Sequence, residues 1–227
     1  MRRNSNIFAR GSNWICGLIR AQNGIAVVEF ALCLPFVLVA TLTAAELANY
    51  TVTKMRVSQL ALRLADDGSR IGTGDLLSTK QITEAQINDL MTGADLQGSA
   101  LGLFTNGKVV LTSLEPVANP NTTDRYRIRW QRCRGSLTYS SGFGKQGDTN
   151  LTGISVNSQT LKAPEGGAVI LAEVAYRYQP LIGSRWLNLS SMVETAGMYV
   201  RDNREYAGPT GGVGIYNPEN VTASTCS

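Results

Sequence analysis

Few residues of this 227-residue chain could do chemistry, and one of them lies in an unusual place. Glu29 stands inside a run of apolar side chains that begins just after Gly24. An ionisable group in an apolar run is costly, so it is by default a sign of function. The alternative is that Glu29 lies near a membrane interface, where its charge costs little and has no role. Glu29 is therefore the first candidate functional residue.

The composition restricts catalytic chemistry. The chain contains no histidine, which excludes histidine general bases, Ser-His and Cys-His nucleophile pairs and imidazole metal ligands. No grouping of carboxylates, or of serine with lysine, suggests a replacement. We expect that the protein is not an enzyme and that it holds neither a cofactor nor a metal ion.

Two of the four cysteines are candidates for a disulfide. Cys16 precedes Gly24 and Cys33 lies within the apolar run, which leaves Cys133 and Cys226 in the rest of the chain. None of the four forms the CxxC pairs of a metal site. In an oxidising compartment Cys133 and Cys226 would form a disulfide that pins the C-terminal tail to a central strand. The alternative is two unpaired thiols.

The positive charge of the chain belongs to its N-terminus. Four arginines precede Gly24 with no acidic residue among them, namely Arg2, Arg3, Arg10 and Arg20. Without these four, the 21 basic residues fall to 17, which equals the number of acidic residues. Nucleic-acid backbones are bound by clustered Lys and Arg, so a neutral body makes nucleic acid an unlikely class of partner and we expect none.

Residues 25–45 form an apolar segment of about the 20 residues that a helix needs to cross a bilayer. Because arginines accumulate on the cytoplasmic side of a span, residues 1–24 are expected to be a basic cytoplasmic leader, with the chain exported after about residue 46. An ordinary secretory signal, cleaved after the small residues 43–45, is the alternative. The segment is therefore predicted to be a single-pass membrane anchor.

The start of this segment resembles a known leader. The order from Gly24 onward is a glycine, four apolar residues, Glu29 and the aromatic Phe30, which resembles the class III prepilin leader. Residues 24–70 look like the TadE and TadG-like minor pilins, or pseudopilins, of the Tad (Flp) pilus system. The matching positions are Val28, Glu29, Phe30, Ala31, Leu32, Leu34 and Pro35.

The resemblance implies a cleavage site and a set of partners. Prepilin peptidase would cut between Gly24 and Ile25, with Glu29 and Phe30 taking part in leader recognition. The new α-amino group of Ile25 could then pair with the Glu29 carboxylate of the same or a neighbouring helix, since a buried charge is tolerable when it is paired. Other Tad pilus subunits and pseudopilins, and the inner membrane, would be the remaining partners.

Beyond the span, the pattern predicts an amphipathic stalk helix over 46–70 that ends near Asp67 and Gly68. Its apolar residues recur every three or four positions at Leu47, Tyr50, Val57, Leu60, Ala61 and Leu64. Thr83 and Gln86 form a capping box that predicts a short helix to about residue 91.

Residues 71–227 are predicted to form a small periplasmic α+β domain. Apolar and polar residues alternate over 126–131 and 173–179, as in half-buried strands, and further strands are expected near 109–111 and 192–200. These strands would form an antiparallel sheet beside the long helix, and residues 208–227 a loop. A dense basic cluster would be a solvated sheet face paired with nearby acidic residues or, alternatively, a site for a polyanion or an acidic partner surface: Arg125, Arg127, Arg129, Arg132 and Arg134.

These observations favour a structural function. The leading hypothesis is a minor pilin-like inner-membrane protein for biogenesis of Tad/Flp (type IVb) pili that supports surface adherence. The alternative is an uncleaved, membrane-anchored periplasmic binding module that holds a partner protein or a surface. An anchored enzyme is the weakest hypothesis, because no catalytic grouping is present in the sequence.

Overall fold

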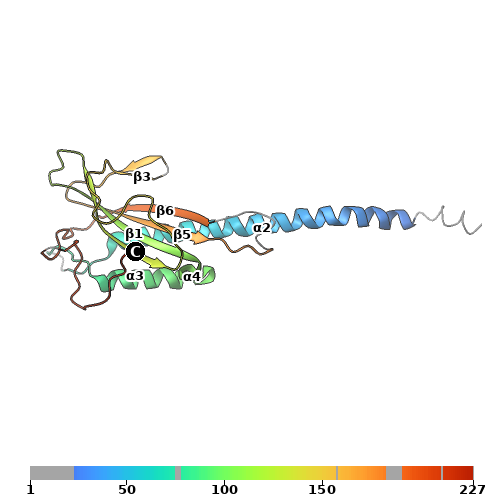
Figure 1. The fold of residues 1–227 in the computed structure, drawn as a ribbon, viewed down its shortest axis with the longest axis horizontal. Coiled ribbons are helices and arrows are strands. Elements are labelled where there is room, and N and C mark those ends of the chain that lie inside the picture. Colours follow the sequence, from blue (N-terminus) through green and yellow to red (C-terminus); the bar gives the residue numbers. More distant parts are fainter. Residues whose placement is uncertain (1–22, 75–77, 157, 183–190, 211, 227) are drawn as a thin grey trace, which may run out of the picture. The chain divides into compact units, whose positions relative to one another are not determined.

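The structure is a computed structural model that describes residues 23–74, 78–156, 158–182, 191–210 and 212–226. The predicted leader therefore lies outside the described residues, except for its last two positions. The chain divides into two compact units, Met1–Ala48 and Asn49–Ser227, which are described separately. The second unit contains the sheet, and its class is α+β, as predicted (Figure 1).

A long helix, α2, runs over Asn23–Arg70 and includes Pro35. It ends at Arg70, close to the expected end near Asp67 and Gly68, and Gly68 packs closely on the sheet. A Cβ at Gly68 would lie 3.0 Å from the Cγ2 atom of Ile170 on the sheet. The helix ends where Arg204 donates hydrogen bonds from Nη2 to the carbonyl oxygens of Ser69 (3.1 Å) and Ile71 (2.6 Å), which satisfies carbonyls that a helix end leaves open.

Within the second unit, the C-terminal part of α2 packs on the sheet. The predicted apolar stripe is confirmed from Val57 onward, since Val57, Leu60, Ala61 and Leu64 are buried. Tyr50 also packs against this core. Leu47, which belongs to the first unit, is 47% exposed, so the stripe does not continue through it.

Helix α3 spans Glu84–Gln97 and confirms the capping box. The backbone N–H of Gln86 donates to Thr83 Oγ1 (3.3 Å), and that of Thr83 donates to Gln86 Oε1 (3.0 Å). The helix continues six residues past the predicted end, through Gly93, and is capped at Gly98. A short 3₁₀ turn, η1 (Ser99–Leu101), and α4 (Leu103–Asn106) lead into the sheet.

The main sheet has four antiparallel strands in the order β2-β1-β5-β6. All four predicted strands are present, as β1 (Gly107–Pro116), β2 (Tyr126–Gly135), β5 (Val169–Arg177) and β6 (Ser191–Tyr199). A hairpin of β3 (Ile154–Val156) and β4 (Gln159–Leu161) was not predicted. Strands of three residues are too short to show a period of two.

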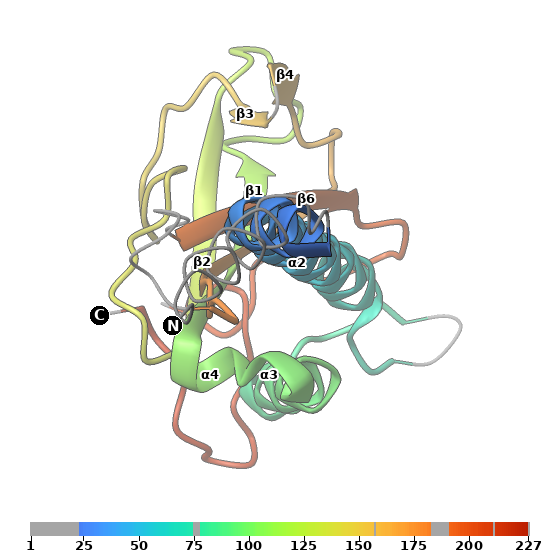
Figure 2. The ribbon, with the colours of Figure 1, turned by 90° about the vertical axis from the view of Figure 1, so that its right-hand side faces the viewer.

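Both faces of the sheet are covered. Val109 and Leu111 belong to the core cluster that includes the helices, whereas Leu114 and Leu171 pack with the segment that carries the hairpin. Figures 1 and 2 show α3 and the hairpin on opposite sides of the sheet. The expectation of half-buried strands was therefore wrong for β5, in which every residue except Arg177 is buried.

Candidate functional site

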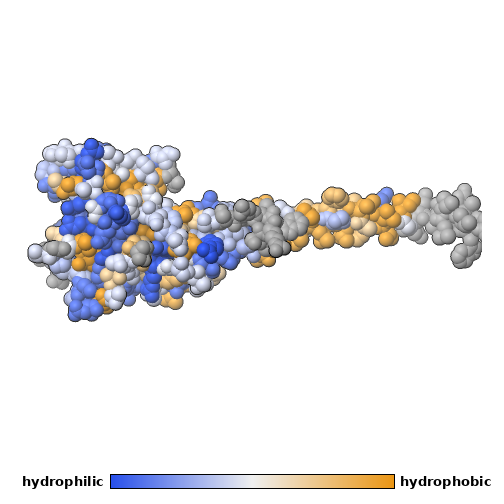
Figure 3. Space-filling view, in the orientation of Figure 1, coloured by the Kyte–Doolittle hydropathy of each residue, from blue (hydrophilic) through white to orange (hydrophobic). Residues whose placement is uncertain are grey.

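The N-terminal part of α2 is an apolar helix whose side chains are exposed. Ile25, Phe30 and Phe36 are 57%, 66% and 77% exposed, and Figure 3 shows the apolar colouring of this part of the helix. It is the one helix of the described residues that is long and apolar enough to cross a membrane. An apolar surface of this extent normally marks a membrane or protein contact.

The predicted leader residues lie together on the first turns of this helix. Gly24, Ile25, Glu29 and Phe30 are all helical and exposed. Because residues four apart are neighbours on one helix face, Ile25 and Glu29 are one turn apart. A Cβ added at Gly24 would meet no atom within 4 Å, so this glycine has no packing role in the described part of the chain.

Thr41, a polar residue of the same helix, forms the hydrogen bonds of its hydroxyl group within the helix. Thr41 Oγ1 lies 2.9 Å from the carbonyl oxygen of Val37 and 3.0 Å from that of Leu38. Such bonds to the preceding turn satisfy a hydroxyl without water. Glu29 makes no hydrogen bond or ion pair within the described residues, and it therefore differs from Thr41 in needing a partner or an aqueous interface.

The arginines of β2 form only in part the solvated face that was expected from the sequence. Arg132 is 3% exposed and pairs with Glu84 of α3. Arg129 donates to the carbonyl oxygen of Ala207 (2.7 Å). Arg134 lies over the Phe104 ring at 5.2 Å. The cluster is therefore divided, because Arg132 is buried against α3 whereas Arg134 is exposed. The expected pairing with acidic residues is present for Arg132 with Glu84 and for Arg127 with Glu115.

Glu115 is buried at one end of the same face. Its side chain is 4% exposed, and Arg127 Nη2 lies 3.9 Å from Glu115 Oε2. Burial raises the pKa of this carboxyl to about 7, although Arg129, Arg127 and Arg204 act to lower it. A buried charge is costly, so the protonation state of Glu115 is linked to the stability of the fold.

We expect Glu115 to make stability depend on pH. Its folded pKa of about 7 exceeds its ordinary value of 4.5, so the folded chain binds this proton more tightly than the unfolded chain. The resulting stabilisation is fully present below pH 4.5 and is lost as the pH rises through about 7. It amounts to about 3 kcal/mol.

Urea unfolding of the detergent-solubilised chain, followed by tryptophan fluorescence between pH 5 and pH 8, measures this effect. Glu115→Gln is expected to remove most of the pH dependence across this range. Glu165→Gln, at an exposed position, is the matched control and should keep the parent profile. A Glu115→Gln profile as steep as that of the control would contradict the assignment.

Cys133 and Cys226 form a disulfide, with Cα atoms 4.8 Å apart and a separation of 93 positions in sequence. The tail also bonds along the edge of β2, where the backbone N–H of Cys133 donates to the carbonyl oxygen of Ser224 (2.7 Å). Thr225 forms a bridge with Arg132. The tail therefore covers an edge that would otherwise present open backbone groups.

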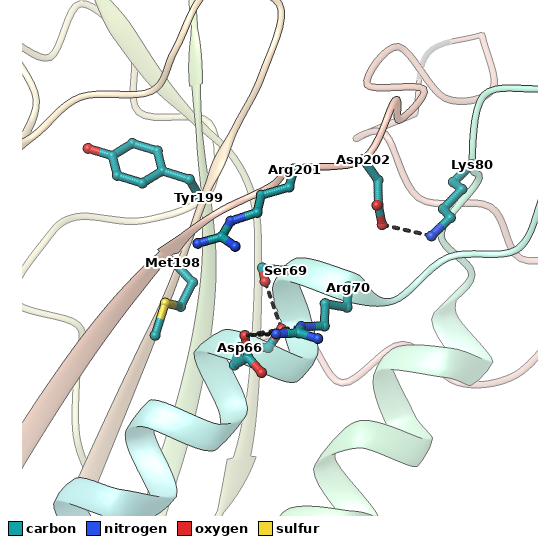
Figure 4. Close-up of a pocket in the computed structure, with 8 residues that line it drawn as sticks. All are labelled: Asp66, Ser69, Arg70, Lys80, Met198, Tyr199, Arg201 and Asp202. Carbon is teal, nitrogen blue, oxygen red and sulfur yellow. Dashed lines mark hydrogen bonds and ion pairs between the residues drawn. The ribbon is translucent and has the colours of Figure 1, made fainter.

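A hollow of about 340 Å³ lies beside the end of α2 (Figure 4). Figure 4 shows Asp66 paired with Arg70 (3.0 Å) and Asp202 paired with Lys80 (2.7 Å). These pairs neutralise two of the three cations, and the third, Arg201, is exposed. The hydrogen-bonded pair of Lys80 and Asp202 joins the segment before α3 to the segment after β6.

Several buried charges of the second unit were not predicted from the sequence, among them Glu84, Glu115 and Glu173. Glu173 accepts hydrogen bonds from the hydroxyls of Tyr139 (2.7 Å) and Ser141. Nothing in the local pattern distinguishes these carboxylates from solvent-facing ones. The sequence signal of internal pairing was the arginine cluster of β2, which was expected to pair with nearby acidic residues.

The fold and the helix define a class of protein with one candidate membrane span and a disulfide-tied antiparallel sheet domain. Residues 24–66 match the family described as TadE-like protein, which confirms the predicted resemblance over this segment and links the chain to Tad pilus-related proteins. The match does not extend to the sheet. No curated protein matches the chain. No solved structure matches it.

Proposed function

We propose that this protein is a minor pilin-like subunit of the bacterial inner membrane that serves biogenesis of Tad/Flp (type IVb) pili and thereby surface adherence. The observation that carries the proposal is the exposed apolar helix that begins with Gly24 and Glu29 inside the segment that matches the TadE-like family. The role is structural and not catalytic. The partners are prepilin peptidase and other Tad pilus subunits and pseudopilins.

The proposed topology follows from the charges and the cysteines. Residues 1–24 remain in the cytoplasm, because four arginines precede the span. Residues 25–45 cross the membrane, and the domain lies in the periplasm. That compartment is oxidising, which suits the disulfide of Cys133 and Cys226.

Glu29 would act by pairing helices. Cleavage before Ile25 creates an α-amino group, and a charge within an apolar helix bundle is tolerated when it is paired. Since Ile25 and Glu29 are one turn apart, the carboxylate of one subunit can meet the amino group of its own helix or that of an adjacent helix. Pairing between subunits would set their axial register.

We expect cleavage after Gly24. The test recovers the C-terminally tagged protein from membranes of cells with and without prepilin peptidase and determines its N-terminal sequence. A chain that begins at Ile25 only when the peptidase is present supports the proposal. The Gly24→Leu variant should remain uncut. Because a Cβ at this position meets no atom within 4 Å, the loss of cleavage would mean that the peptidase no longer recognises the leader, and not that the fold is disturbed.

Two results would contradict the proposal. A chain that keeps Met1 in both strains would indicate an uncleaved anchor and favour a membrane-anchored binding module. A chain that begins near residue 46 would indicate ordinary secretion and remove the anchor altogether. Gly93→Ala, which also meets no atom within 4 Å, is the matched glycine control and should be cut like the parent.

A further inference from the structure

A cavity of about 420 Å³ lies on the sheet face opposite to the helices. Lys108 and Gln131 line it from β1 and β2, and Tyr139, Ser140, Lys145 and Asp148 line it from the segment after β2. The disulfide forms part of its wall, since Cys133 and Cys226 also line it. The volume falls within the range of about 300–1,000 Å³ that is usual for small-molecule sites.

Lys108 is the unusual residue of this cavity. It is only 9% exposed, and within the described residues its ammonium group has neither a hydrogen bond nor an ion pair. Its neighbours across the strands are Gly135 and Ala175. Because cross-strand neighbours lie side by side on one face, these two small residues leave open the space beside the lysine.

The buried acidic residue of the same face, Glu173, forms no ion pair with Lys108 within the described residues. Glu173 lies opposite Val110, two positions from Lys108 along β1. Its carboxylate is instead bonded by the hydroxyls of Tyr139 and Ser141 and by the backbone N–H of Gly142 (3.2 Å). The wall thus satisfies the buried carboxylate and leaves the ammonium group of Lys108, which lines the cavity, without an ion-pair partner in the described residues, so an incoming anion can pair with it.

The wall is fixed before any ligand arrives. Gln131 Nε2 donates to Thr112 Oγ1 (3.0 Å) and to the carbonyl oxygen of Gly144 (3.1 Å). The backbone N–H of Gly147 donates to the carbonyl oxygen of Ile128 (2.9 Å). A site held by such bonds loses little freedom when it binds a small molecule.

The polar groups of the cavity specify the ligand. Lys108 and Lys145 are donors only, and they suit a carboxylate. Gln131 Oε1 and Asp148 are acceptors, and they suit hydroxyl groups. Tyr139 adds an aromatic ring, which can pack against an apolar ring face. A small hydroxylated ring that carries one carboxylate meets all three requirements.

We propose that this cavity binds an acidic sugar, with the carboxylate at Lys108 and the hydroxyl groups at Gln131 and Asp148. An acidic peptide offers a carboxylate but few hydroxyl donors, so it fits the acceptors less well. The site lies wholly within the sheet domain and does not depend on cleavage of the leader.

The test is calorimetric titration of the full chain in amine-oxide micelles, which contain no sugar. The probe is D-glucuronate, and D-glucose is the matched ligand without a carboxylate. We expect saturable binding of D-glucuronate and binding of D-glucose that is weaker by at least about tenfold. Lys108→Met is expected to weaken D-glucuronate binding by a similar factor, and Lys162→Met, outside the cavity, should have no effect.

Lys145→Met provides a second variant, because this lysine is exposed and its loss should leave the fold intact. It is expected to weaken D-glucuronate binding even if Lys108→Met does not fold. Equal binding of D-glucuronate and D-glucose, or no saturable binding, would overturn the proposal. So would a cavity variant that binds like Lys162→Met, or tighter binding of a glutamate-containing peptide than of D-glucuronate.

Discussion

Loss of the disulfide through Cys226→Ser is expected to lower the free energy of unfolding by about 4.6 kcal/mol. The 93-residue separation of the two cysteines sets this value, because a cross-link reduces the entropy of the unfolded chain in proportion to the logarithm of the loop length. Without the disulfide, the tail is still held by hydrogen bonds. Besides the backbone bond between Cys133 and Ser224, they include one from Asn88 Nδ2 to the carbonyl oxygen of Thr222 (3.0 Å) and one between the side chains of Ser224 and Asn88 (2.8 Å).

Urea unfolding of the detergent-solubilised chain measures this loss, and limited proteolysis shows whether the tail is released. Cys33→Ser is the matched control, because Cys33 is an exposed, free thiol of the apolar helix. Its free energy of unfolding should equal that of the parent. If Cys226→Ser also unfolded like the parent, the disulfide would not constrain the unfolded chain.

The helices could be predicted from the sequence where their apolar residues recur at a regular spacing or where a capping box marks their start. The apolar stripe at Val57, Leu60 and Leu64 indicated a helix face that packs, and Thr83 with Gln86 fixed the start of α3. Helix ends were less accurate. Helix α2 ends at Arg70, close to the expected end near Asp67 and Gly68, whereas Gly93 was taken as a stop and is tolerated within α3.

The burial of residues on the sheet face opposite to the helices could not be predicted, because the segments that cover this face are distant in sequence. Glu173 alternates with Val174 in the manner of a solvent-facing residue, yet the segment of Tyr139 and Ser141 covers it. The cavity beside Lys108 could not be predicted for the same reason. Its small neighbours Gly135 and Ala175 are brought together only by strand register, which the sequence alone does not state.

Breaking the ion pair between Glu84 and Arg132 is expected to have the second large effect. Both residues are buried, with exposures of 5% and 3%. Arg132 Nε donates to Glu84 Oε2 (2.9 Å) and Arg132 Nη2 donates to Glu84 Oε1, which makes the pair bidentate. Glu84 is also the first residue of α3, where the helix dipole favours a negative charge.

Removing one partner leaves the other charge buried and unpaired, which costs about 3–5 kcal/mol. We therefore expect Glu84→Gln and Arg132→Met each to lower the free energy of unfolding by roughly this amount in urea titrations. The double variant should lose much less than the sum, because it leaves no unpaired charge. Additive losses would mean that the pair does not act as a unit.

Asp66→Asn, which breaks the exposed pair with Arg70, is the control and should change the free energy of unfolding by less than about 1 kcal/mol. The contrast follows from solvent: water screens the exposed pair and can solvate the partner left behind, whereas α3 and the sheet exclude water from Arg132.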